Sequence, residues 1–110
     1  MIDDVVLIQS LQNIATIQPG EKASIRNGLV TKDSNANPFF RWLSGDNRNM
    51  TLIVIQEIVE VSFVSMNPIV QNLISQVPSG LRNLKETYKT DKHTCKQIDV
   101  VLDRIKNYMV

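Results

Sequence analysis

The chain has 110 residues, a net charge of +1 and 43% hydrophobic residues. This length suits one domain, and we expect residues 1–110 to form a single helical domain. A charged fraction of 21% beside that apolar share is ordinary for a folded protein and excludes a disordered chain. The balanced charge is also well short of what a nucleic-acid-binding domain usually shows.

Three features that the sequence lacks indicate the compartment: a disulfide, a signal peptide and a membrane span. A single cysteine, Cys95, allows no intramolecular disulfide, which suits a reducing compartment. Residues 1–4 lack the basic segment of a classical signal peptide. The longest apolar run, residues 52–66, contains Glu57 and Glu60 and falls short of the ~20 residues of a membrane span. We therefore expect no membrane span and a cytoplasmic location.

The first expected element is a helix that begins after Asp3 or Asp4, since either carboxylate can cap the first turn. Pro19-Gly20 ends it. Residues 23–31 then predict a β-hairpin, because Asn27-Gly28 tolerates the positive φ of a two-residue turn. Such a ribbon is marginal alone in water, so it must pack on the helices if it forms.

Two helices are expected in the middle of the chain. Asn37-Pro38 resembles an N-cap followed by proline at the first position, which predicts a short helix over residues 38–44. Asp46 can cap the next segment, residues 50–66, whose apolar side chains nearly encircle a helix. Residues 59–63 also alternate as a strand does, but the length of the segment favours a central helix.

Asn67-Pro68 either starts a new helix or kinks the preceding one, and its apolar face continues to a break expected at residues 78–80. Beyond that break, apolar residues recur at steps of three and four. They are Leu81, Leu84, Tyr88, Cys95, Ile98, Leu102, Ile105 and Met109.

This last stretch is one long helix or two helices, residues 81–89 and 92–109. We favour two, because Thr90 and Asp91 are good N-caps and poor interior residues. The shared phase predicts only a small bend between them. The chain as a whole predicts a mainly α fold, a compact bundle of about five helices with a possible short β-hairpin near residues 23–31.

Residues that could support catalysis or hold a cofactor are few. Cys95 and His93 lie two positions apart, so on a helix they point to opposite sides, and we expect Cys95 to be buried. Asp99 and Asp103 are four positions apart and could share a cation, but no further metal ligands follow them. The four glycines are isolated, without a phosphate-binding loop. We expect no catalytic, metal or cofactor site, although a small enzyme without a recognisable site stays an alternative.

A basic stripe follows one step behind the apolar stripe: Arg82, Lys85, Lys89, Lys92 and Lys96. On nearly collinear helices these five cations would line one edge for about 20 Å and could contact phosphates or an acidic partner. The competing interpretation is that they only solvate the flank of an amphipathic helix.

A second cluster contains Arg41, Trp42, Asp46 and Arg48. Trp42 can anchor a corner between two helices, while Arg41 or Arg48 pairs with Asp46. Tryptophan and arginine are also favoured at interaction hot spots, but we favour the structural corner.

Three segments carry a resemblance: Ile17-Gln18-Pro19-Gly20-Glu21-Lys22, then Arg41-Trp42 with Gly45-Asp46-x-Arg48-x-x-Thr51, then Gly80-Leu81-x-Asn83-Leu84-x-x-Thr87-Tyr88. This pattern resembles small helical modules of effector-like proteins from intracellular bacteria such as Legionella. The resemblance implies a module that is delivered to, or works inside, a host cell, often beside other domains, so a host cytosol is the alternative location. It implies no catalytic residues.

The sequence therefore predicts a non-catalytic protein-interaction or regulatory module, monomeric and with another protein as its partner. Binding of nucleic acid or an acidic partner through the basic stripe is the alternative.

Overall fold

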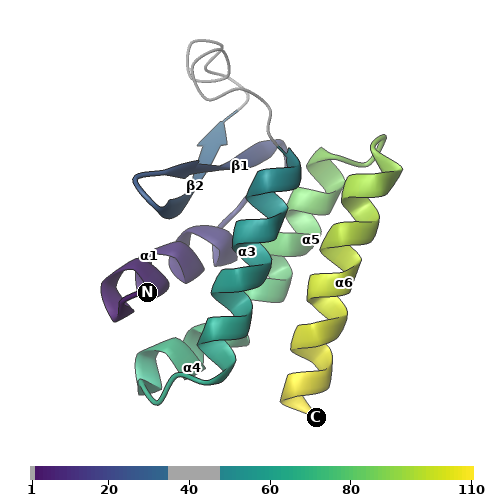
Figure 1. Ribbon diagram of the computed structural model, residues 1–110. Coiled ribbons are helices and arrows are strands. Elements are labelled where there is room, and N and C mark those ends of the chain that lie inside the picture. Colours follow the sequence, from purple (N-terminus) through teal and green to yellow (C-terminus); the bar gives the residue numbers. More distant parts are fainter. Residues whose placement is uncertain (1, 35–47) are drawn as a thin grey trace.

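The computed structural model describes residues 2–34 and 48–110. Its elements, in chain order, are α1 (Asp4–Ala15), β1 (Glu21–Arg26), β2 (Leu29–Ser34), α3 (Arg48–Phe63), α4 (Pro68–Ile74), α5 (Val77–Thr87) and α6 (Lys92–Met109). The described residues thus form five helices and one antiparallel hairpin (Figure 1), which confirms the expected fold class. The helix expected at residues 38–44, with Arg41, Trp42 and Asp46, lies outside the described residues.

The first helix begins as its sequence predicts. The side chain of Asp3 accepts a hydrogen bond from the backbone N–H of Val6 at 2.9 Å, which satisfies one free donor of the first turn. The buried face of α1 carries Leu7, Leu11 and Ile14, each at most 2% exposed.

The hairpin forms where Asn27-Gly28 predicted it, with φ of 52° at Asn27 and 78° at Gly28. It packs on α1, which also satisfies its backbone. Val30 is fully buried, its N–H donates to Ser10 Oγ at 3.2 Å, and its carbonyl accepts from Asn13 Nδ2 at 2.8 Å. These two polar side chains of a helix explain how a marginal two-stranded ribbon is held.

The central helix is α3, which contacts α1, α4, α6 and both strands. The helical interpretation of residues 50–66 is therefore confirmed, although the helix ends at Phe63. Asn67 then starts a new helix, because its side chain accepts from the N–H of Ile69 at 2.9 Å and Pro68 occupies the first position of α4.

The break expected at residues 78–80 is wrong. These residues lie in the first turns of α5, where proline is tolerated because its missing N–H would have no helical partner. Gly80 is buried against α1, and a Cβ at this position would lie 1.7 Å from the carbonyl oxygen of Ile14. Gly80 therefore permits the close approach of two helix backbones and does not turn the chain.

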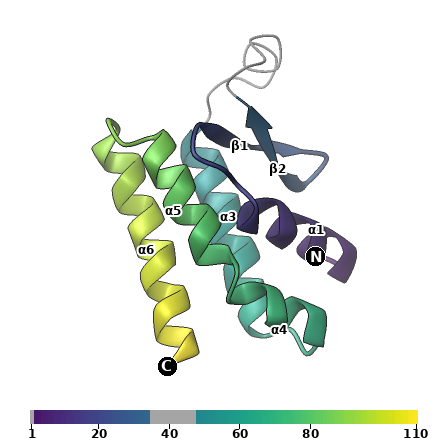
Figure 2. The ribbon, with the colours of Figure 1, turned by 180° about the vertical axis from the view of Figure 1, so that it is seen from behind.

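Two C-terminal helices are confirmed, but the small bend expected between them is wrong. The chain reverses after α5, so that α5 and α6 lie side by side and antiparallel (Figures 1 and 2). The spacing of apolar residues indicates only which side of each helix is buried, and it does not determine the angle between the two helices. The antiparallel arrangement of α5 and α6 also buries the predicted apolar sides, since Leu84 and Ile98 are both fully buried.

The buried face of α6 is also rotated slightly from the expected stripe. Thr94 and Val101 are each 1% exposed, whereas Cys95 is only half-buried and Met109 is 53% exposed. The expectation that Cys95 is buried is therefore wrong. This helix packs on both α3 and α5, and that double contact shifts its buried face by about one position.

Candidate binding site

The reversal between α5 and α6 brings all five residues of the predicted basic stripe to one open groove. This basic groove has a volume of about 670 Å³. It is lined by Arg82, Lys85, Glu86, Lys89, Lys92, Cys95, Lys96 and Asp99. Arg82 and Lys85 come from α5, Lys89 from the turn after it, and Lys92 and Lys96 from α6, so the cations occupy both walls of a hollow instead of one long edge. Five cations against two carboxylates leave a net charge of +3.

Two of the five cations are paired within the groove. Lys85 Nζ lies 2.8 Å and 3.1 Å from the carboxylate oxygens of Asp99, and this hydrogen bond raises the pKa of Lys85. Lys89 Nζ lies 3.4 Å from Glu86 in an exposed pair. Exposed pairs of this kind are weak, so an incoming carboxylate can compete for the lysines.

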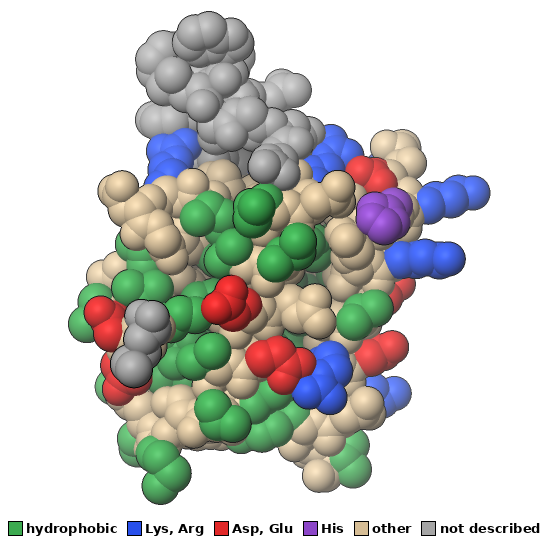
Figure 3. All heavy atoms as spheres, in the orientation of Figure 1, with side chains coloured by type: hydrophobic (Ala, Val, Ile, Leu, Met, Phe, Trp, Pro, Cys, Tyr) green, Lys and Arg blue, Asp and Glu red, His purple; other side chains and the backbone are tan. Residues whose placement is uncertain are grey.

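The other three cations have no ion pair within residues 2–34 and 48–110. Arg82, Lys92 and Lys96 are all exposed. Figure 3 shows lysine or arginine side chains that project at the right edge of the molecule, the side on which α6 lies in Figure 1. Lysines on a single helix face usually serve only as a solvated flank. Here cations from two helices converge on one hollow, which raises the local positive potential.

Cys95 is the neutral group of the groove. Its Sγ donates to the carbonyl oxygen of Tyr88 at 3.2 Å and lies 3.7 Å from that of Lys85. His93, the residue weighed as its base, is exposed and does not line the groove. The Cys–His pair is thus not brought together.

The turn between α5 and α6 is held by Arg48, one of the predicted corner residues. Its guanidinium lies 2.8 Å from the carboxylate of Asp91 and 4.4 Å from the centre of the Tyr88 ring. Asp91 also caps α6 by accepting from the N–H and hydroxyl of Thr94, at 3.1 Å and 2.7 Å. Those two bonds, then the Arg48 contact, lower the pKa of Asp91 to about 2. Arg48 therefore holds the turn between α5 and α6 to the start of α3.

A second set of hydrogen bonds fixes α5 to the segment that leads from α1 into β1. Asn83 Nδ2 donates to the carbonyl of Ile17 at 2.8 Å, and Thr87 Oγ1 donates to that of Glu21 at 3.0 Å. The N–H of Gly20 donates to Thr87 Oγ1 at 2.9 Å. Two of the three segments that carry the resemblance thus meet in space, and these contacts explain their residues by packing. The sequence contained no signal for contacts between positions so far apart.

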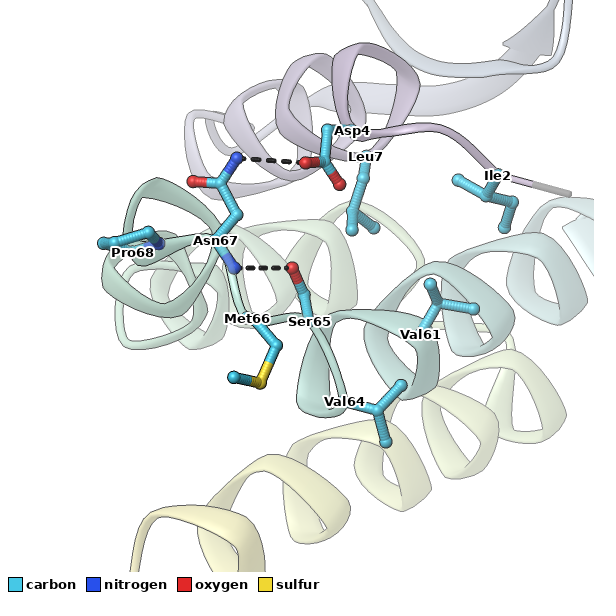
Figure 4. A pocket seen from close by; sticks show the side chains of 9 residues that line it. All are labelled: Ile2, Asp4, Leu7, Val61, Val64, Ser65, Met66, Asn67 and Pro68. Atoms are coloured by element: carbon cyan, nitrogen blue, oxygen red, sulfur yellow. Dashed lines mark hydrogen bonds between the residues drawn. The ribbon is translucent and has the colours of Figure 1, made fainter.

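A different hollow, of about 520 Å³, lies between the start of α1, the end of α3 and the start of α4 (Figure 4). We call it the α1–α4 hollow. It is lined by Ile2, Asp4, Leu7, Val61, Val64, Ser65, Met66, Asn67 and Pro68. Sequence reasoning missed it, because its walls come from segments about 60 positions apart that only the packing of α1 on α4 brings together.

A further ion pair joins α3 to α6. Glu60 on α3 accepts from Arg104 on α6 at 2.7 Å and 2.9 Å, and this bond lowers the pKa of Glu60. In the described part of the chain, no group of three or more His, Cys, Asp or Glu residues is placed to hold a metal ion. No described helix is both long enough and apolar enough to cross a membrane.

Comparison with known proteins finds no family model, no curated protein and no solved structure that matches this chain.

Proposed function

We propose that the protein is a non-catalytic, monomeric binding module that captures an acidic segment of a partner protein in the basic groove. The observation that carries the proposal is the convergence of five cations from α5, α6 and the turn between them on one hollow of about 670 Å³. Carboxylates of a partner would find donors on both walls at once. Such charge complementarity steers association and selects the partner.

A protein segment suits this groove better than a nucleic acid. Glu86 and Asp99 line the groove beside the cations and would repel a continuous row of phosphates. The whole chain carries a charge of only +1, whereas nucleic-acid-binding domains usually present a larger basic surface. Glutamate and aspartate side chains spaced along a helix can instead reach individual cations. The resemblance to effector-like modules suggests that such a partner belongs to a host cell.

The proposal is tested with a short polyglutamate peptide, followed through the backbone amide signals of the labelled protein. We expect the shifts to gather on α5 and α6 around Arg82, Lys92 and Lys96. The variant Lys92→Gln/Lys96→Gln should bind about tenfold more weakly, which corresponds to about 1.4 kcal/mol for two lost charge contacts.

The matched control is Lys32→Gln/Lys106→Gln, which removes the same charge from exposed or half-exposed positions outside the groove. Equal binding by the two double variants would refute the proposal. A single-stranded DNA oligomer is the second probe. If it binds the same residues more tightly than polyglutamate, with an affinity that falls steeply as salt rises, the groove is a nucleic-acid site instead.

A further inference from the structure

We propose that the α1–α4 hollow is a second docking surface, which binds an apolar segment of a partner protein that also carries lysine or arginine. This surface is separate from the basic groove and opposite to it in charge. Three features of the described residues lead to this assignment: exposed aliphatic side chains, a hollow to receive a partner, and a carboxylate at its edge that no described lysine or arginine pairs with.

The apolar feature is the concentration of exposed aliphatic side chains at this place. Val64 is 79% exposed and Met66 is 94% exposed, and both line the hollow. Val5 on α1 and Ile69 on α4 are also exposed, at 63% and 56%, although neither lines the hollow. Single exposed apolar residues are common on proteins, but a group of them around a hollow marks an interaction site. Figure 4 shows the labelled side chains of Leu7 on α1 and Val61 on α3, with Val64 and Met66 on the segment that follows α3.

The hollow has room for more than one side chain. Its volume of about 520 Å³ lies within the ~300–1,000 Å³ typical of binding pockets. The half-buried Val61 supplies apolar surface inside it, whereas Leu7 is only 2% exposed. A short amphipathic segment that inserts its apolar side is the partner such a surface accepts.

The charge of the hollow selects the kind of segment. Asp4 Oδ2 accepts from Asn67 Nδ2 at 3.1 Å (Figure 4), and no lysine or arginine among the described residues pairs with it. None of the described residues that line the hollow is basic, and Asp3 adds a second carboxylate next to it. A purely apolar partner would remove water from Asp4 without replacing it, which is costly. A partner with a lysine or arginine beside its apolar side chains avoids that cost.

The experiment compares two synthetic amphipathic helical peptides, one of leucine and lysine and one of leucine and glutamate. Each is added to the labelled full chain, and amide shifts identify the binding site. We expect the leucine–lysine peptide to shift the signals of residues 2–7 and 61–68. The leucine–glutamate peptide should leave them unchanged. Equal shifts from the two peptides would overturn the proposal.

Three variants locate the interaction. Met66→Lys replaces an exposed apolar side chain by a cation outside any helix, so it should fold normally and bind the leucine–lysine peptide at least tenfold more weakly. Asp4→Asn should weaken binding and reduce its dependence on salt. The control Val100→Lys changes a side chain on α6 that is 51% exposed and should have no effect. Unchanged affinity in Met66→Lys, or weakened affinity in Val100→Lys, would contradict the assignment.

The same labelled protein and variants also test whether a second copy of the chain covers the hollow, and whether the hollow is independent of the basic groove. Concentration-dependent shifts at the hollow without any peptide would show that a second copy of the chain covers it, which would overturn the proposal. The variant Lys92→Gln/Lys96→Gln should bind the leucine–lysine peptide like the parent. The two surfaces can therefore fail independently of one another.

Discussion

Substitution of Gly80 by alanine separates two opposite expectations. Helix propensity alone predicts a gain, because alanine in a helix interior is about 1 kcal/mol more favourable than glycine. The structure predicts a loss. A Cβ on Gly80 would lie 1.7 Å from the carbonyl oxygen and 2.7 Å from the carbonyl carbon of Ile14, both of them backbone atoms that cannot rotate away.

The magnitude follows from how far the helices must move. Cβ atoms essentially never lie closer than 3.0 Å to such a neighbour, so α1 and α5 must separate by more than 1 Å. That separation loosens the packing of fully buried residues, among them Ile14 and Leu81. Overpacking of a core costs about 1–3 kcal/mol, and a backbone obstacle belongs at the upper end. After the helix-propensity gain, we expect Gly80→Ala to lower the free energy of unfolding by about 2 kcal/mol.

The assay is urea unfolding followed by circular dichroism, with thermal unfolding as a second measure. A loss of this size should lower the melting temperature by roughly 10 °C for a domain of this length. The matched control is Ser79→Ala, an exposed position on the same helix, which should be neutral or stabilise by about 0.5 kcal/mol. If Gly80→Ala is as stable as the parent or more stable, the close approach of α1 and α5 is wrong.

Three further predictions concern α6 and the turn before it. The pKa of Asp91, about 2 in the folded state against an ordinary 3.8, means that its bonds stabilise the fold above about pH 4 and are lost as the pH falls towards 2. Unfolding free energies across that window should therefore fall more steeply for the parent than for Asp91→Asn. Cys95 should react faster with an anionic aryl disulfide than with a neutral one, relative to the rates in denaturant, because cations line its groove; equal relative rates would count against the local potential. Tyr108→Phe should cost no more than about 1 kcal/mol in urea unfolding, through its hydrogen bond to Gln71 at 2.6 Å. Tyr108→Ala should cost at least about 0.5 kcal/mol more, because it also removes the stack on Phe63 at 4.3 Å; equal losses in the two variants would show that the stack contributes nothing.

The sequence by itself determined the local structure of the described elements. Asp3, Asn67 and Asp91 all cap helices as their residue types predict, and Asn27-Gly28 forms the hairpin turn. Each of these features depends on hydrogen bonds and φ preferences within about three residues. Such interactions are complete within a short segment, so the segment alone specifies them.

The tertiary structure decided how those elements meet, and with it both candidate sites. The spacing of the five cations was visible in the sequence, but their placement on two walls of one groove required the reversal between α5 and α6. Gly80 was expected to end a helix, and only its neighbour Ile14 explains it. The α1–α4 hollow joins segments about 60 positions apart and had no sequence signal. The period of the apolar residues indicates which face of a helix is buried. It does not determine which element covers that face or in which direction that element runs.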